Sequence, residues 1–203
     1  MNIMNKRILF LTTAFFMLGG CVTGYTLVEP GQHAIDTMTV NASSGWNLAP
    51  GYASPGKRRN AQVWTQDGLL LDRLVFIPAV PDGQPLLISR AKDAALPVFH
   101  KSMLPNELEE LVESTIVKLF GEGQAAVSTS KLRPHRFGEH RGVMFDINAV
   151  VSESPVYNGV VGAFIVNDEL YIMWYFGAEP YYYGKHLADA EAIISSATIA
   201  SLN

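Results

Sequence analysis

Cysteine, basic residues and long apolar runs are all scarce in this sequence of 203 residues. The single cysteine, Cys21, excludes an intrachain disulfide. Lys and Arg together number 15 against 19 Asp and Glu, which gives a formal net charge of -4. Binding to nucleic acid needs a basic surface that neutralises phosphates, so we expect no nucleic-acid partner. Hydrophobic residues at 48% and charged residues at 17% indicate a folded globular chain and not a disordered one.

The longest apolar run lies near the N-terminus and is too short to cross a bilayer. Residues 8–18 carry no charge and follow Lys6 and Arg7, whereas a transmembrane helix needs about 20 apolar residues. A short basic region, an apolar stretch and small residues at its end are typical of a secretory signal peptide. We therefore expect residues 1–20 to be a cleaved signal peptide.

Leu18, Gly19, Gly20 and Cys21 resemble the lipobox of bacterial lipoproteins. In that family a signal peptidase recognises the residues before the cysteine and cuts ahead of it, and the thiol and the new amino group are acylated. The resemblance implies that Cys21 carries diacylglycerol and palmitate, and that this N-terminal lipid holds the protein at a membrane. Val22 stands where an aspartate would retain an enterobacterial lipoprotein in the inner membrane, which implies the outer membrane, facing the periplasm. An ordinary secretory signal with a chance cysteine is the alternative interpretation.

The rest of the sequence divides into a short tether and one domain. Residues 21–35 contain Pro30 and two glycines, and we interpret them as a lipid-anchored tether. Residues 36–203 have a length that suits a single globular domain.

The clearest helix signal spans residues 105–120. Pro105 suits a first helical turn, and the acidic residues that follow it complement the helix dipole. Apolar residues then recur at helical spacing until Gly121 ends the pattern. A second helix is predicted over residues 187–200. The apolar stripe of the first helix consists of Leu108, Leu111, Val112, Thr115, Ile116, Leu119 and Phe120.

Alternating and β-branched stretches predict strands, separated by turn signals such as Asp67-Gly68 and Asn167-Asp168. Both faces of segment 69–77 are apolar, so this strand should be covered on both sides. Pro155 with Asn158-Gly159 is interpreted as a turn, and the proline-rich segments 49–60 and 78–100 as mostly irregular. The expected strands span residues 37–40, 63–65, 69–77, 125–132, 142–151, 160–166 and 170–176.

This order of elements predicts an α+β fold in which helices pack on an antiparallel sheet. Across residues 36–200 the order is similar to the PsbP-like fold, an α/β/α sandwich named for an extrinsic photosystem subunit. The lipobox together with Gly45-Trp46-Asn47 and Val63-Trp64-Thr65 also resembles small proteobacterial lipoproteins, a resemblance that implies no activity.

Residues 133–141 are the most polar segment of the expected domain. We interpret the segment as a solvated hairpin loop, with a functional alternative. The alternative is a cationic patch that meets an anionic partner, such as a lipid headgroup phosphate or a polymer carboxylate. The candidate patch consists of Arg133, His135, Arg136, His140 and Arg141.

Tyrosine and tryptophan gather in the last third of the chain. They are interpreted as core and edge packing, or as a stacking surface for a glycan or a peptide. The candidate aromatic surface consists of Tyr171, Trp174, Tyr175, Tyr181, Tyr182 and Tyr183.

No motif predicts a catalytic residue, a metal site or a cofactor. The histidines form neither HxH nor HExxH, and the only cysteine is expected to carry lipid. We therefore expect a non-catalytic, lipid-anchored envelope protein that binds or helps to assemble another envelope component, either a protein or a glycan. Two alternatives remain, an envelope hydrolase whose site is assembled only by the fold and a carrier of a small apolar ligand.

Overall fold

The computed structural model describes residues 24–51, 58, 60–88, 95–121, 123–152 and 154–199. The predicted signal peptide and the lipobox residues Leu18, Gly19, Gly20 and Cys21 lie outside the described residues. None of the described helices is long and apolar enough to span a membrane.

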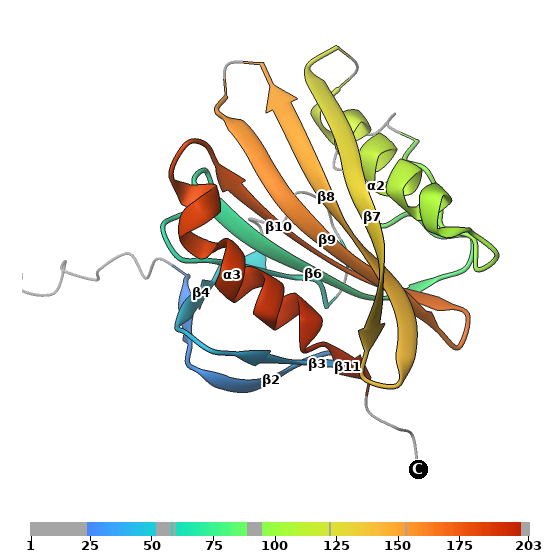
Figure 1. Ribbon diagram of the computed structural model, residues 1–203, viewed down its shortest axis with the longest axis horizontal. Coiled ribbons are helices and arrows are strands. Elements are labelled where there is room, and N and C mark those ends of the chain that lie inside the picture. Colours follow the sequence, from blue (N-terminus) through green and yellow to red (C-terminus); the bar gives the residue numbers. More distant parts are fainter. Residues whose placement is uncertain are drawn as a thin grey trace, which may run out of the picture.

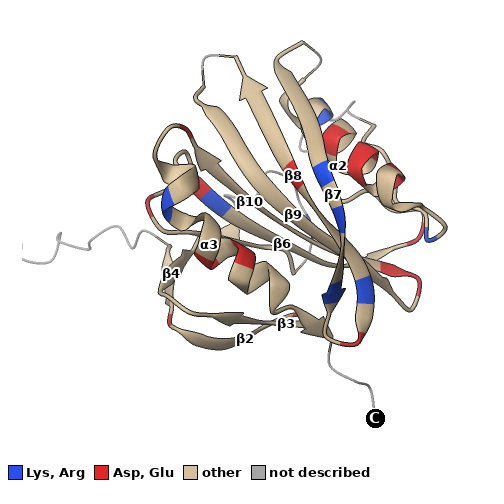
Figure 2. Ribbon diagram, viewed as in Figure 1, with Lys and Arg blue, Asp and Glu red and all other residues tan. Residues whose placement is uncertain are grey.

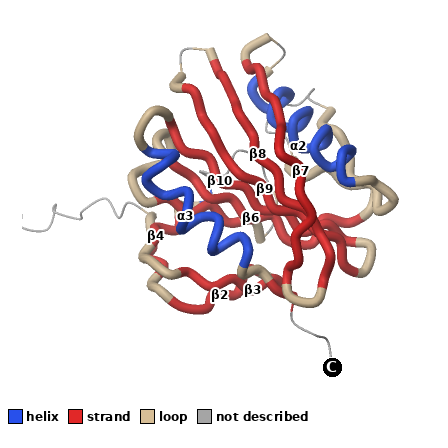
Figure 3. Tube along the Cα trace, viewed as in Figure 1, coloured by secondary structure: helices blue, strands red, loops and turns tan. Residues whose placement is uncertain are grey.

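An antiparallel eight-stranded sheet runs through the middle of the molecule (Figures 1 and 3). The strand order places β1 and β7 at the two edges and β6 and β10 side by side near the centre. In spatial order the strands are β1 (Thr26–Val28), β4 (Trp46–Leu48), β5 (Gln62–Thr65), β6 (Asp72–Pro81), β10 (Glu169–Ala178), β9 (Val156–Val166), β8 (His140–Val151) and β7 (Ala125–Phe137).

The two central strands are buried on both faces, as predicted for most of segment 69–77. Residues 69–71 differ from the prediction, because they form a turn before β6 in which Leu70 is 78% exposed. On β6, Val75 and Ile77 pack into one core, whereas Leu74 and Phe76 pack into the other, and all four are fully buried. β10 alternates in the same way, with Trp174 facing the first core. A sheet that is apolar on both sides needs a cover on each side.

Helix α2 (Pro105–Phe120) covers one face, and its bounds are those predicted from the apolar stripe. Leu108, Leu111, Val112 and Ile116 are buried in the core that α2 shares with the sheet. Phe120, at the end of the stripe, differs from the prediction because it is 40% exposed.

Helix α3 (Tyr182–Ser195) and a small three-stranded sheet cover the opposite face (Figure 1). Ala190, Ile193 and Ile194 of α3 are fully buried there. The small sheet consists of β2 (Gly31–Ile35), β3 (Met38–Ala42) and β11 (Thr198–Ile199), in the order β11-β3-β2. The structure therefore has the predicted α+β architecture, with an antiparallel sheet between two covering layers.

Several other local predictions were wrong. Residues 26–28 and 31–35 are not tether but strands β1 and β2. Asn158-Gly159 lies inside β9, where it pairs with β10, and the last helix begins at Tyr182, ahead of the predicted start. Residues 78–81, predicted as irregular, continue β6. Pro78 is tolerated there because β5 pairs with β6 only as far as Phe76, and the register with β10 shifts close to Pro78. Pro78 therefore removes no hydrogen bond that the ladder requires.

Shortening an apolar side chain on α2 tests whether this helix packs on the sheet as described. Leu111→Ala or Ile116→Ala should lower the free energy of unfolding by about 2–5 kcal/mol, because each side chain leaves a cavity in a packed core. Chemical denaturation measures the loss. Ser114→Ala, at an exposed position on the same helix, serves as the control and should stay near wild type.

Substitution by alanine at two glycines should change stability in opposite directions. A Cβ atom at Gly159 would overlap the carbonyl oxygen of Tyr175, so Gly159→Ala should destabilise the sheet. Gly184 lies within α3 with open space around its Cα, so Gly184→Ala should raise stability by up to about 1 kcal/mol through helix propensity. Equal Tm values for the two variants in thermal unfolding would contradict this packing of β9 on β10.

Candidate functional site

The predicted cationic cluster forms the end of the β7–β8 hairpin and not a loop. β7 continues to Phe137 and β8 starts at His140, so only Gly138 and Glu139 remain as the turn. Gly138 has a φ of +55°, a conformation that glycine adopts without strain. Figure 2 shows Lys and Arg gathered along β7 and at the adjacent end of β8, whereas most of the sheet is uncharged.

The hairpin divides the candidate patch between the two faces of the sheet. Arg133 belongs to the α3 side, where it contacts Asp146 at 2.9 Å and Glu191 of α3 at 3.3 Å. His135 packs edge-on against Phe137, with ring centroids 4.7 Å apart, and Phe137 is part of the core beneath α3. His140 pairs with Phe137 across the ladder and points to the same face.

Arg136 and Arg141 lie on the other face and directly opposite each other. They are paired residues of the β7–β8 ladder, so both side chains point to the α2 side, as does Val143 two residues along β8. Like charges in this arrangement are destabilising. The structure offers weak compensation, since the Arg136 guanidinium lies 4.0 Å from the exposed carboxylate of Glu139. Among the described residues, Arg141 has no ion pair.

An open depression of about 480 Å³ surrounds this arginine pair. Guanidinium groups bind carboxylate and phosphate oxygens in a bidentate manner, and two neighbouring guanidinium groups suit one oxyanion. The Nε2 atom of His135, also a lining residue, is buried and has no hydrogen-bond partner among the described residues. The depression is lined by Pro134, His135, Arg136, Arg141 and Gly142.

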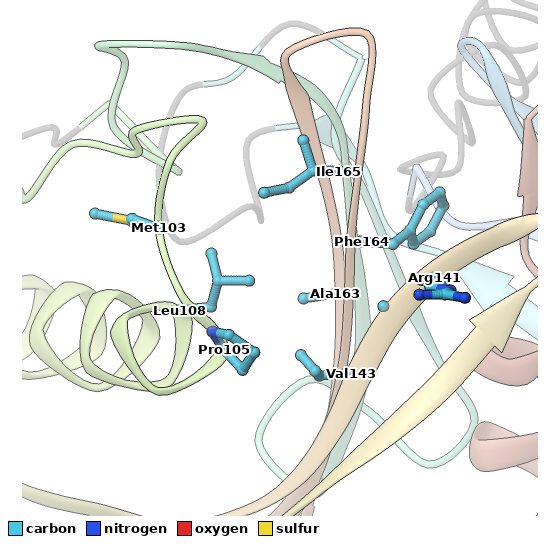
Figure 4. Close-up of a pocket in the computed structure, with 9 residues that line it drawn as sticks. Met103, Pro105, Leu108, Arg141, Val143, Ala163, Phe164 and Ile165 are labelled. Carbon is cyan, nitrogen blue, oxygen red and sulfur yellow. The ribbon is translucent and has the colours of Figure 1, made fainter.

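A smaller apolar pocket of about 210 Å³ adjoins the depression and shares Arg141 and Gly142 with it. In Figure 4, Pro105, Leu108 and Met103 at the start of α2 stand across from side chains of the sheet. The ring of Phe164 points away from that space. The sheet side is lined by Val143, Ala163 and Ile165.

The candidate aromatic surface is not continuous. Tyr171, Trp174 and Tyr175 are almost fully buried on β10, and they alternate between the two cores, as the packing interpretation predicts. Burial raises the pKa of Tyr175, whose hydroxyl donates to the carbonyl oxygen of Tyr182. Tyr181 is 61% exposed, with Tyr182 and Tyr183 half-buried beside it at the start of α3. The buried members therefore cannot stack on a glycan.

The structure brings together a polar cluster that no sequence pattern indicates. Asp67, Asp72 and His186 place one ligand-type atom each within 4.8 Å of one another. His186, buried on α3, contacts Asp67 at 2.5 Å, and Lys185 contacts the same carboxylate at 2.7 Å. Hydrogen bonds from His186 and Lys185 hold the pKa of Asp67 below its ordinary value.

The hydrogen bonds of this cluster join the β5–β6 turn to α3. The Asp72 carboxylate accepts hydrogen bonds from the backbone N–H groups of Gln66 and Asp67 at 2.8 and 2.7 Å. The ammonium group of Lys185 donates to both oxygens of Asp67, at 2.9 and 2.7 Å, so the cluster clamps the turn to α3. Among the described residues no serine or threonine hydroxyl hydrogen-bonds His186.

Asp189, one turn further along α3, holds a second part of the same network. Its carboxylate accepts hydrogen bonds from the β3–β4 turn and from the β5–β6 turn, so it fastens α3 to both. Burial raises the pKa of Asp189, but these hydrogen bonds outweigh burial and hold the pKa below its ordinary value. The donors are the Ser43 and Ser44 hydroxyls, Trp46 Nε1 at 2.8 Å and Gln66 Nε2 at 3.3 Å.

No protein-family model matches the chain, and no curated protein matches its sequence. Among solved structures, the cyanobacterial PsbP protein (CyanoP) of Synechocystis matches with a TM-score of 0.56 and 12% identity, over 90% of this chain and 96% of its own. A protein from Bacteroides thetaiotaomicron matches with a TM-score of 0.43 and 12% identity, over 86% of this chain and 50% of its own. LpqN of Mycobacterium tuberculosis, involved in cell envelope biogenesis, matches with a TM-score of 0.35 and 9% identity, over 90% of this chain and 87% of its own.

These matches bear on architecture alone. The similarity to CyanoP confirms the predicted PsbP-like fold, and at 12% identity it carries no information about ligand or partner. The other two similarities are too low to support an argument about function.

The Asp189 network predicts a definite pH dependence of stability. Because the folded pKa of Asp189 lies below its unfolded value of about 3.9, its contribution is present above that value and is lost as the pH falls through the folded pKa. Asp189→Asn should cost about 1–3 kcal/mol at pH 7. The difference from wild type should shrink in denaturation experiments at successively lower pH. Asp36→Asn, at an exposed turn, is the control.

Proposed function

We propose that this protein is an outer-membrane lipoprotein that faces the periplasm and binds an anionic component of the envelope through the arginine pair Arg136 and Arg141. The single observation that carries the binding role is the direct opposition of these two cations. Among the described residues the only carboxylate that compensates them is that of Glu139, 4.0 Å from Arg136, which also donates to the Glu139 carbonyl oxygen at 3.1 Å. A bound phosphate or carboxylate group would remove their mutual repulsion and use their free donors.

The geometry of the sheet favours a partner other than the lipid that anchors the chain. β1 starts at Thr26, a few residues after Cys21, so a lipid on Cys21 would hold the β1 edge near the bilayer. The arginine pair lies on the β7–β8 hairpin near the opposite edge, six to seven strand spacings or roughly 29–34 Å across the sheet. We infer that the hairpin reaches away from the anchoring membrane toward a polymer or a second envelope component.

The two alternative functions find less support. A hydrolase would need a nucleophile beside the Asp67–His186 pair, and the hydroxyls of Ser43 and Ser44 bind Asp189 instead. A carrier of a small apolar ligand would need an enclosed apolar cavity beneath the sheet. The pockets at the ends of α2 measure 210 and 230 Å³, below the roughly 300–1,000 Å³ of pockets that enclose drug-sized molecules, so each leaves room only for a much smaller ligand.

Replacing the lipidated residue tests the anchor. Cys21→Ser should leave the protein without acyl mass and remove it from the outer-membrane fraction, because no thiol remains to receive the lipid. Mass spectrometry of the mature N-terminus and membrane fractionation give the readout. A wild-type N-terminus other than Cys21, or a bare thiol on Cys21, would refute the lipoprotein assignment.

Neutralising the arginine pair tests the binding role. The intact lipoprotein in neutral detergent micelles should bind soluble peptidoglycan fragments, whose stem peptides carry carboxylates, or glycerol phosphate, and calorimetry measures each. Arg136→Gln with Arg141→Gln should weaken the binding at least tenfold, since a hydrogen bond to a charged group contributes about 1.5–3 kcal/mol.

Lys118→Gln is the matched control, because it removes one positive charge from an exposed position on α2. It should leave the affinity unchanged. An equal loss in Lys118→Gln would mean that net charge alone attracts the probe, and the absence of binding to both probes would overturn the proposal.

A further inference from the structure

A second pocket, of about 230 Å³, lies at the C-terminal end of α2. The last turns of the helix form one wall, with Ile116, Leu119 and the exposed Phe120. The sheet forms the other wall, where Arg73 of β6 is the direct ladder partner of Phe176 on β10. The complete lining is Arg73, Ile116, Leu119, Phe120, Trp174 and Phe176, so one cation lies among apolar and aromatic side chains.

The Arg73 guanidinium has aromatic neighbours in place of an acidic partner. Its central carbon lies 5.4 Å from the ring centroid of Tyr157 and 5.8 Å from that of Phe176. Within the part of the chain that the structure describes, no carboxylate lies within 4 Å of it. Burial lowers the pKa of Arg73, yet a guanidinium stays protonated in proteins, so the pocket keeps a positive charge.

Arg73 shares its lack of a carboxylate partner with Arg141 but differs in this respect from three other cations beside the sheet. Arg133 contacts two carboxylates, Lys131 contacts Asp146, and Lys185 contacts Asp67. Arg73 is more enclosed than Lys131, and its neighbours are the rings of Tyr157 and Phe176. Among the described residues its N–H donors have no carboxylate acceptor. A purely structural arginine in such a place would normally have an acceptor, because a buried charge is costly when unpaired.

We propose that this pocket is a binding site for a small apolar carboxylic acid, whose carboxylate pairs with Arg73 and whose body packs between α2 and β10. The volume limits the body to one aromatic ring or a short acyl chain, since an apolar cavity of about 150 Å³ accommodates benzene. Phe120 is 40% exposed and stands at the mouth, so the acid enters past it from solvent. The site lies at the opposite end of α2 from the arginine pair and is independent of the function proposed for that pair.

The experiment uses the intact protein in neutral detergent micelles, with benzoate as the probe and the tryptophan indole N–H resonances as the readout. Trp174 lines the pocket, whereas the other two tryptophans lie in the core beneath α3, where their indole groups donate to Asp189 and Gln62. Benzoate should therefore shift the resonance of Trp174 in a saturable manner and leave those of Trp46 and Trp64 in place. Benzyl alcohol, which has the ring without the charge, should bind at least tenfold more weakly.

Arg73→Gln should reduce the affinity for benzoate at least tenfold and bring it to that of benzyl alcohol. Lys118→Gln, a charge loss elsewhere on the same side of the sheet, should bind as wild type. If Arg73→Gln fails to fold, Arg73→Lys keeps the charge without the bidentate fork. Its affinity for benzoate should then lie between that of the wild type for benzoate and that of the wild type for benzyl alcohol. An unmoved Trp174 resonance, equal affinity for benzyl alcohol and benzoate, or unchanged binding by a folded Arg73→Gln would each overturn the proposal.

Discussion

The burial of β6 and β10 on both faces is the constraint on which the rest of the structure depends. Two adjacent strands without a solvent-facing side cannot be stable unless each face has its own cover, and the chain supplies α2 for one face and α3 with the small sheet for the other. A helix is shorter than a twisted eight-stranded sheet is wide, so the cover ends before the sheet does. The two apolar pockets lie where α2 ends, at Pro105 and at Phe120. Their positions are thus a consequence of the fold, whereas the arginine in each is a property of this sequence.

On the α3 side, polar contacts help to hold the cover on the sheet. The cover there has two parts, α3 and the small sheet, and the turns beside them need partners for their polar groups. Asp189 on α3 accepts hydrogen bonds from two turns that are distant in sequence. Asp67, on the second of these turns, contacts Lys185 and His186 of α3, so both turns are fixed to the same helix. This group of titratable side chains therefore joins α3 to the two turns. The pKa values of Asp67 and Asp189 are lowered by the same hydrogen bonds that hold the turns in place.

Local sequence patterns predicted the elements whose structure depends on neighbouring residues. They failed for segments whose structure depends on contacts with residues far away in the sequence. The bounds of α2 follow from its apolar period, and Asn167-Asp168 forms its hairpin turn because both residues adopt positive φ values. Residues 133–141 were predicted as a loop because their charges mask the alternation that continues both strands of the hairpin. Gly159 was assigned to a turn because no sequence pattern reveals that the backbone of β10 leaves no room for a side chain. The Asp67–His186 contact joins residues 119 positions apart, and no local sequence pattern predicts that two such residues come together in the fold.

The arginines of the hairpin admit a second explanation, and the identity of the strands decides between the two. An exposed edge strand needs charged side chains that discourage pairing with another chain, and β7 is such an edge. This requirement accounts for Lys131, Arg133 and Arg136 on β7. It accounts less directly for Arg141, because β8 is an inner strand whose pairing with β9 begins at the next residue, Gly142. Protection of the edge would also be served better by a carboxylate opposite Arg136, which would remove the repulsion between like charges. The anion binding that we propose between the two strands would give a cation at that position a role, and Arg141 is therefore the residue on which the functional interpretation of the hairpin depends.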